Sequence, residues 1–241
     1  MFDGSDARDL PALSLTWRDG LFAHWPVDPS RVRPLVPDEL DVETREGTAW
    51  VSALPSLVTA SRPWFLPEAV GLTFPQVTLR TYVRHETRPG VYFLSVDADT
   101  ALGVGIARAL WDLPYHRADV DFETVGETRR VDSRRVDPGE PPARFAAAYR
   151  PTGEAVRPDP DSLSAFLAER HRLYLVRDGT VRCARVEHEP WRLCPAEASV
   201  HADALLEAAG LPAPAEDPMV RYAPGASFAV RTPFRARARG G

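Results

Sequence analysis

The chain has 241 residues, of which 44% are hydrophobic and 26% are charged, with a formal net charge of -5. This composition is ordinary for a globular protein, and the negative charge argues against nucleic-acid binding, which normally requires a basic surface. No run approaches the roughly 20 apolar residues that a membrane span requires, and the acidic start MFDGSDARDL resembles neither a signal nor a transit peptide. We therefore expect one domain over residues 1–241, with its core at 17–232, in the cytoplasm, without nucleic-acid or membrane partners.

All 29 basic residues are arginines, so the sequence contains no lysine. Schiff-base chemistry on a carbonyl substrate needs a lysine amine, and it is therefore excluded here. Codon bias in a GC-rich genome explains this better than salt adaptation, because 34 acidic residues nearly balance the basic ones. Cys183 and Cys194 form no CxxC pair and are expected to be free thiols.

The first third of the chain indicates a strand, a helix and a hairpin. Asp28 caps the helix and Pro29 occupies its first turn. Glu46-Gly47 forms the turn of the hairpin, and three prolines with Trp64 and Phe65 predict an ordered loop over apolar surface. The strands are expected at 21–25, 42–44 and 49–58, the helix up to 37, and the loop at 61–75.

The central stretch from 74 to 117 predicts a second hairpin followed by a helix. Val77, Leu79, Thr81 and Val83 form the more apolar face of a strand, so the alternating residues Arg80 and Tyr82 share the other, polar face. A turn at 87–90 leads to a returning strand at 91–98. Asp99 or Thr100 then caps a helix that runs to about 110 and ends before Pro114.

The remaining chain is again rich in strands. Asp161 is expected to cap a helix that includes Glu169 and Arg170. Asp178-Gly179 has the composition of a tight hairpin turn, and Gly210 suits the C-cap of a last helix. Strands are expected at 118–123, 128–136, 144–150, 174–176, 181–188 and 226–232.

Hairpins are thus the common connection among about ten strands, with three or four helices at the periphery. Doubly wound parallel sheets require strands and helices to alternate, which they do not here. We predict a β-rich α+β fold whose antiparallel sheet is closed or nearly closed into a barrel, with the helices outside it or at its mouth.

Several short segments occur in an order that resembles the YqjF-like DUF2071 family of uncharacterised bacterial and archaeal proteins, over roughly 17 to 232. They are Leu35, Pro37 and Leu40; RTYV at 80–83; GVYFLSVDA at 90–98; Ala107-Arg108; LPY at 113–115; FLAERHRLY at 166–174; and HEPW at 188–191. The family is related in fold to acetoacetate decarboxylase, which implies a conical antiparallel barrel with an interior ligand cavity. The decarboxylase mechanism cannot be carried over, because it depends on a Schiff-base lysine.

The first group of candidate ligand-binding residues surrounds the central hairpin. It consists of Arg80, Tyr82, Arg108 and Tyr115. An arginine offers a planar fork of donors that matches a carboxylate or phosphate. The alternative is that Arg80 or Arg108 pairs internally with Asp97, Asp99 or Glu169, and this structural role is weighted slightly higher.

The second group follows the helix near 166. Glu169 and His188 are the candidate catalytic acid and base, and Tyr174 and Trp191 are candidate ligand contacts. For His188, a hydrogen bond to a backbone carbonyl is the favoured alternative. The six histidines show no HxH or HExxH spacing, so no metal site is predicted. GVGIAR at 103–108 lacks the third glycine of a dinucleotide fingerprint, so no cofactor is predicted either.

The leading functional hypothesis is a pocket for a small anionic or carbonyl-containing metabolite. An enzyme with this pocket would perform lyase-like acid/base chemistry without a lysine. The competing hypotheses are a non-catalytic ligand-binding or sensing protein and a structural assembly subunit, and the sequence leaves homo-oligomer formation open. An enzyme predicts Glu169 or His188 beside Arg80, whereas a binder predicts arginines alone as polar anchors.

Overall fold

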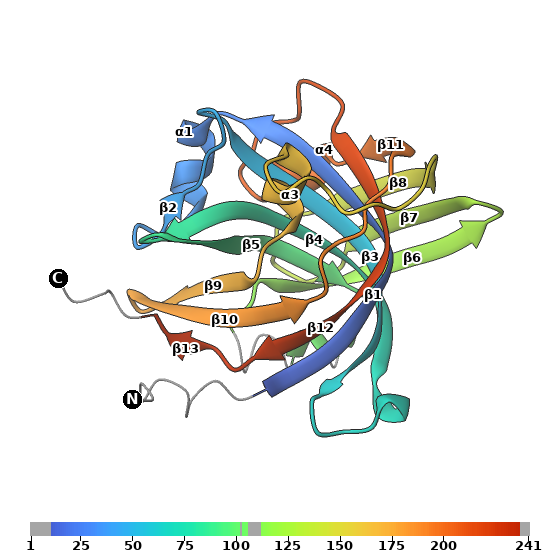
Figure 1. Cartoon of the computed structure of the whole chain (residues 1–241), viewed down its shortest axis with the longest axis horizontal. Coiled ribbons are helices and arrows are strands. Elements are labelled where there is room, and N and C mark those ends of the chain that lie inside the picture. The colour runs from blue at the N-terminus through green and yellow to red at the C-terminus, as the bar shows by residue number, and fades with distance from the viewer. Residues whose placement is uncertain (1–10, 102, 106–111, 237–241) are drawn as a thin grey trace.

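The computed structural model describes residues 11–101, 103–105 and 112–236, which form thirteen strands in one continuous sheet with short helices around it (Figure 1). The strands are β1 (Pro11–Val27), β2 (Asp41–Val42), β3 (Ala49–Pro63), β4 (Leu72–His85), β5 (Arg88–Ala98), β6 (Tyr115–Val125), β7 (Thr128–Arg135), β8 (Arg144–Pro151), β9 (Arg172–Arg177), β10 (Thr180–His188), β11 (Ala196–His201), β12 (Met219–Arg231) and β13 (Phe234–Arg235). The helices that lie wholly in the described part are α1 (Pro29–Val32), α3 (Leu163–Ala168) and α4 (Asp203–Ala208), with 3₁₀ turns η2 (Arg33–Leu35) and η3 (Glu68–Val70); residues 101 and 103–105 are also helical.

Seven of the strands close into a barrel in the order β5-β9-β10-β12-β1-β3-β4, with β4 returning to β5. This confirms the predicted β-rich α+β barrel. Two pairings are parallel, however: β5 with β9 at Val91 and Leu173, and β5 with β6 at Val96 and Tyr115. Parallel neighbours need a crossover connection and not a tight turn, and β5 ends at Ala98 whereas β6 begins at Tyr115.

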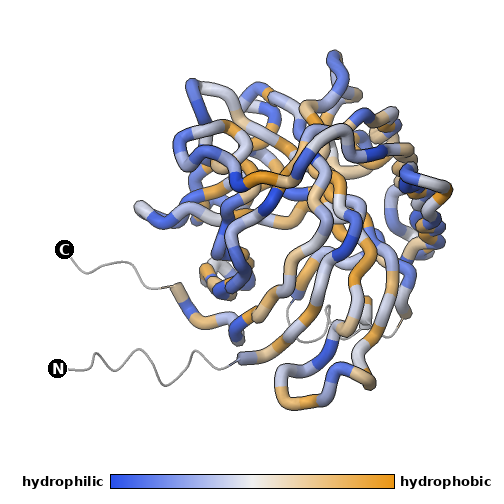
Figure 2. The backbone as a smooth tube through the Cα atoms, turned by 45° about the vertical axis from the view of Figure 1, so that its right-hand side comes forward, coloured by the Kyte–Doolittle hydropathy of each residue, from blue (hydrophilic) through white to orange (hydrophobic). Residues whose placement is uncertain are grey.

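The sheet continues past the barrel through β6, β7, β8 and β11, which lie to the right of it in Figure 1. A large apolar core fills the space between the two parts. In β1, Leu21 and Trp25 belong to this core together with Phe145 and Tyr149 of β8, whereas Phe22 belongs to a different cluster inside the barrel. Polar and apolar residues alternate along the strands (Figure 2), because successive side chains point to opposite faces.

The structure corrects several predicted boundaries. β1 is much longer than the predicted strand at 21–25, and β3 and β4 extend to Pro63 and Leu72, so that strand ends replace both ends of the loop predicted at 61–75. Trp64 and Phe65 at its tip are 53% and 68% exposed, so they do not lie over apolar surface as expected. The long curved strands arise because both ends of β3 and β4 are paired, which local propensity does not reveal.

The helix predicted from Asp161 is also shorter. α3 ends at Ala168, and its cap is Ser162, whose hydroxyl accepts from the Ala165 N–H at 3.1 Å. Glu169 and Arg170 therefore follow the helix. The Asp178-Gly179 turn has positive φ angles of 50° and 68°, as its composition predicted.

In the predicted helix near 100, Thr100 Oγ1 accepts from the Gly103 N–H, which confirms the cap, whereas residues 106–111 lie outside the described part. β11 is a strand that the sequence reading missed. Among the described helices, none has the length and apolar character that a bilayer crossing needs.

Candidate functional site

Buried polar side chains line one face of β4 inside the barrel. Alternation places Gln76, Thr78, Arg80 and Tyr82 on this face, and each is at most 7% exposed. β3 adds Ser52, which lies opposite Arg80 in the register and is fully buried. Burying polar groups costs free energy unless they are hydrogen-bonded, so the partners of these side chains decide what the site can do.

The guanidinium of Arg80 has no carboxylate partner among the described residues. Its Nη2 donates to the Leu167 carbonyl at 2.8 Å, and its Nε makes no hydrogen bond there. Its Cζ lies 5.7 Å from the ring centre of Phe22 and 5.6 Å from that of Tyr82, within the range of cation–π attraction. Leu167 lies in the last turn of α3, where carbonyls lack intrahelical donors, so Arg80 satisfies the end of this helix.

The carboxylates that the sequence offered as alternative partners of Arg80 are otherwise engaged. Asp97 binds Arg135 through two hydrogen bonds of 2.7 and 2.9 Å, and both side chains are buried. Glu169 Oε1 accepts from the backbone N–H of Trp191 at 2.8 Å. No ion pair joins Arg80 to Asp99 in the described part of the chain. The other candidate arginine, Arg108, lies outside the described residues.

A chain of hydrogen bonds links β1, β3, β4 and α3 across the interior. His24 Nδ1 lies 2.6 Å from Ser52 Oγ, which lies 2.7 Å from the Tyr82 hydroxyl, and Tyr82 donates to the Leu167 carbonyl at 2.9 Å. Because Tyr82 donates at the far end, Ser52 donates to Tyr82 and His24 Nδ1–H donates to Ser52. This assigns the tautomer of His24 and leaves its Nε2 as an acceptor.

His24 is held neutral by its surroundings. Burial lowers its pKa well below the usual value, and the positive charges of Arg80 and Arg221 lower it further. The sequence reading missed His24 as a site residue. The available signal was the alternation in the 21–25 strand, which places His24 on the face opposite to Leu21, Ala23 and Trp25.

Arg170 occupies a neighbouring position and, unlike Arg80, is paired. Its Nη1 lies 2.7 Å from Glu43 Oε2, and the two side chains are 5% and 20% exposed. Its Cζ also lies 4.3 Å from the ring centre of Phe166 and 5.3 Å from that of Tyr82. Burial raises the pKa of the Glu43 carboxyl, an effect that Arg170 opposes. Of the two buried arginines around Tyr82, only Arg80 thus lacks a carboxylate among the described residues.

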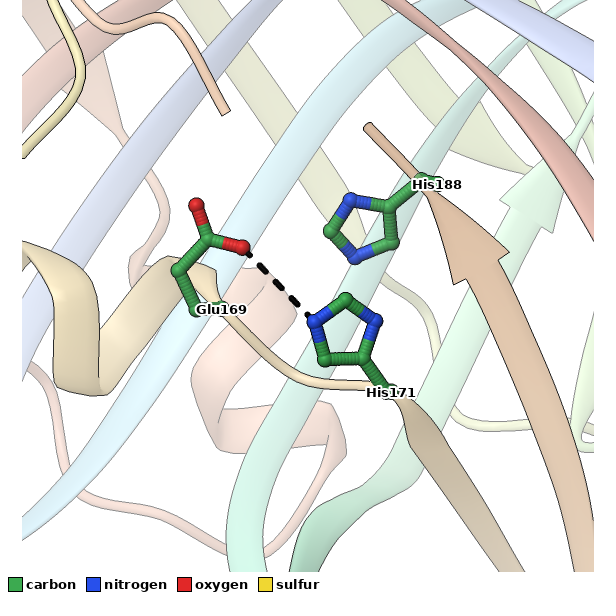
Figure 3. Close-up of side chains that lie close together, drawn as sticks. All are labelled: Glu169, His171 and His188. Carbon is green, nitrogen blue, oxygen red and sulfur yellow. Dashed lines mark ion pairs between the residues drawn. The ribbon is translucent and has the colours of Figure 1, made fainter. Parts of the chain in front are cut away.

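Glu169, His171 and His188 form a second cluster (Figure 3). Glu169 follows α3, His171 precedes β9, and His188 ends β10. Glu169 Oε2 lies 3.9 Å from His171 Nε2, and the two imidazole rings stack with centres 4.5 Å apart. His171 Nδ1 lies 3.2 Å from the Val186 carbonyl, and His188 Nδ1 lies 2.8 Å from the Glu189 carbonyl. The backbone hydrogen bond considered for His188 is therefore present. Burial lowers the pKa of His188, although backbone contacts oppose this.

Aromatic rings come between this cluster and Arg80. The Trp191 ring lies 5.4 Å from that of His188 and, edge-on, 4.9 Å from that of Phe22, over which Arg80 lies. Trp191 and Phe22 also line a narrow crevice together with Trp17 and Leu54, which has no space for a water molecule. The predicted acid and base, Glu169 and His188, thus approach Trp191 and not Arg80.

The two remaining predicted tyrosines lie in different places. The Tyr115 hydroxyl donates to Gln76 Oε1 at 3.4 Å, so it reaches the polar face of β4, and burial raises its pKa to about 12. Tyr174 points away from the barrel interior and donates to the Arg88 carbonyl at 3.0 Å. Its ring covers Gly90, where an added Cβ would lie 2.6 Å from it. Tyr174 is therefore not brought to the Arg80 site.

The closed barrel with a polar interior belongs to the class of acetoacetate decarboxylase-like folds. The chain is similar to the enduracididine biosynthesis enzyme MppR complexed with pyruvate, with 14% identity and a TM-score of 0.65, covering 96% of this chain and 93% of that one. It is also similar to an acetoacetate decarboxylase-like enzyme from Sphingomonas wittichii RW1, with 15% identity, a TM-score of 0.61 and coverage of 95% and 94%. The acetoacetate decarboxylase of Legionella pneumophila gives 11% identity, a TM-score of 0.63 and coverage of 95% and 88%. These likenesses show the fold alone.

The family follows from the sequence comparisons. The profile of DUF2071, described as an uncharacterized conserved protein, matches residues 14–227. The uncharacterized protein YqjF of Bacillus subtilis (strain 168) is 42% identical over 209 residues, which cover 86% of each chain. The chain belongs to the DUF2071 family, which confirms the resemblance seen in its motifs.

Proposed function

We propose that the barrel interior binds a small anionic or carbonyl-containing metabolite, with the Arg80 guanidinium pairing with its negative charge. The observation that carries this proposal is a buried arginine without a carboxylate among the described residues. Leaving a buried cation without an opposite charge is costly, on the order of several kcal/mol. A carboxylate ligand offsets that cost and matches the planar donor fork of arginine.

The fold relatives support the class of ligand. MppR was solved in complex with pyruvate, a small carboxylate that carries a ketone. In this chain the ligand would meet neutral hydrogen-bonding groups, because His24, Ser52 and Tyr82 form a chain beside Arg80. The absence of lysine excludes a Schiff base with the ligand.

Ligand binding has more support than a reaction in which Glu169 and His188 act as acid and base. The Trp191 and Phe22 rings lie between the His188 ring and Arg80, and Glu169 accepts from the Trp191 N–H. Neutral His24, whose Nε2 is an acceptor, is the better placed base for an enzyme of lyase-like chemistry. We therefore propose ligand binding as the function. Both an enzyme and a non-catalytic sensing protein would bind the ligand, and the sensing protein is the main alternative to the enzyme.

A thermal-shift screen with matched ligands tests the proposal. Pyruvate and acetoacetate should stabilise the protein, whereas their neutral amides should not. At a ligand concentration of about 100 Kd the stabilisation is about 2.7 kcal/mol, which corresponds to a Tm increase of roughly 5 to 11 °C for a chain of this size.

Two variants of the same strand separate a specific from a general charge effect. Arg80→Met should abolish the shift, whereas Arg84→Met should retain it, because Arg84 is half-exposed and lies 3.9 Å from Asp41. Equal shifts with acid and amide, or an unchanged response of Arg80→Met, would refute the proposal. If no ligand in the screen shifts Tm, the metabolite proposal is rejected and native mass spectrometry for oligomers tests the assembly alternative.

A further inference from the structure

The side chains of Glu169, His171 and His188 point toward one another (Figure 3). Glu169 and His171 lie between α3 and β9, and His188 is the last residue of β10. One atom from each side chain can be chosen so that all three lie within 4.8 Å of one another. We infer that these three side chains bind a divalent transition-metal ion, with zinc as the expected occupant. This inference goes beyond the proposed function and does not depend on it.

The donor set fits such an ion. Two imidazoles and one carboxylate are the protein ligands of many catalytic zinc sites, and imidazole suits divalent transition metals better than it suits magnesium or calcium. Three protein ligands leave a further position for water or for an oxygen atom of a ligand. The spacing is Glu-x-His followed by a distant histidine, which matches neither the HxH nor the HExxH pattern.

The backbone orients the two histidines for this role. In each ring Nδ1 is the nitrogen close to a carbonyl, that of Val186 for His171 and that of Glu189 for His188. A carbonyl accepts but cannot donate, so Nδ1 carries the proton in each neutral ring and Nε2 keeps its lone pair. The backbone of Arg170 also contacts the His188 ring, and a metal ion would have to displace that contact if it is made by Nε2. Metal-binding histidines commonly have such a partner on the other ring nitrogen, which fixes tautomer and ring orientation.

Glu169 is oriented in the same way. Its Oε1 accepts from the Trp191 N–H at 2.8 Å, and its Oε2 is the oxygen that lies 3.9 Å from His171 Nε2. Zinc bonds of about 2.0 to 2.1 Å in a tetrahedral site require donor separations of roughly 3.3 to 3.4 Å. The donors therefore have to approach by at most about 1.5 Å. The His171 side chain is 51% exposed and has room to turn.

An ordinary surface ion pair and ring stacking account for part of this arrangement. A half-exposed Glu169–His171 pair at 3.9 Å is a weak interaction on its own, and the two imidazole rings stack at 4.5 Å. The lone pair of Nε2 lies in the ring plane, so one ring has to rotate out of the stack before both histidines bind the same ion. The half-exposed His171 side chain has the room to do so.

The test uses the full chain without a histidine tag, treated with EDTA and then dialysed. Zn²⁺ is titrated by calorimetry in competition with a chelator, and Co²⁺ binding is followed by visible absorption, which reports coordination independently of any activity. We expect one ion per chain and a visible absorption spectrum typical of four- or five-coordinate Co²⁺. His171→Ala, His188→Ala and Glu169→Gln should each weaken binding at least about 100-fold, since even the partners of ligands contribute about 10- to 100-fold.

His201→Ala is the matched control, because His201 is an exposed histidine of β11 that lies 3.5 Å from Ser199, outside the cluster. It should bind zinc like the wild type. If His188→Ala does not fold, His171→Ala decides the question, because half of its side chain is in solvent. The inference is wrong if no ion binds at one per chain, or if His171→Ala binds as tightly as His201→Ala.

Discussion

Replacing Arg80 by methionine tests the central feature of the site, a buried positive charge without a carboxylate. The variant loses one hydrogen bond from a charged donor to the Leu167 carbonyl, about 1.5 to 3 kcal/mol. It also loses contacts over Phe22 and Tyr82, about 0.5 to 2 kcal/mol each. In return it no longer buries a guanidinium, which costs several kcal/mol, and methionine fills a similar volume. These effects nearly cancel.

We therefore expect Arg80→Met to change the free energy of unfolding of the ligand-free protein by less than about 2 kcal/mol, in either direction. Urea unfolding followed by tryptophan fluorescence measures this from the midpoint and slope. The same preparation should fail to respond to carboxylate ligands. Arg84→Met, on the same strand, serves as the control for both measurements.

A large loss of stability would refute the reasoning. If Arg80→Met unfolds about 3 to 5 kcal/mol more easily, the arginine behaves like one partner of a compensated buried ion pair. An acidic group would then neutralise it in the ligand-free protein, and the argument for an anion from solution would fail.

Three further predictions concern buried titratable groups. Glu43→Gln should destabilise the protein by about 3 to 5 kcal/mol in urea, because it leaves Arg170 buried without its carboxylate; Glu197→Gln, at an exposed pair, should cost less than about 1 kcal/mol, and equal losses would contradict the burial argument. The lowered pKa of His24 means that only the unfolded chain takes up its proton below about pH 6.5, so stability should fall as the pH drops through this range. His24→Gln should flatten that slope, and an unchanged slope would show that other groups cause it. Burial raises the pKa of the Cys183 thiol to about 11, so the unfolded chain loses this proton first, and stability should fall as the pH rises from about 9 to 11. Cys183→Ala should remove part of this alkaline loss, and a thiol that reacts rapidly in the native protein at pH 8 would contradict the raised pKa.

Local sequence patterns predicted which strands, turns and helices exist better than they predicted the residues at which these elements begin and end. The alternation around Arg80 and Tyr82 and the Asp178-Gly179 turn depend on neighbouring residues only, and both appear as expected. The long ends of β3 and β4 and the early end of α3 do not follow from local preference, because distant partners decide whether a backbone group is paired. The parallel pairing of β5 with β6 does not follow from local preference either, because it depends on where the chain returns to the sheet.

Sequence alone determined the family, the barrel class, the lack of lysine and the shared face of Arg80 and Tyr82. These rest on motif order, composition and the period of a strand, all of which can be read along the chain. Only the tertiary structure decided that Arg80 is buried without a carboxylate among the described residues, and that His24 belongs to the hydrogen-bonded chain beside it. The same holds for the cluster in which the donor atoms of Glu169, His171 and His188 lie close together. The physical reason is that burial and pairing depend on barrel closure, which brings residues from distant parts of the chain into contact.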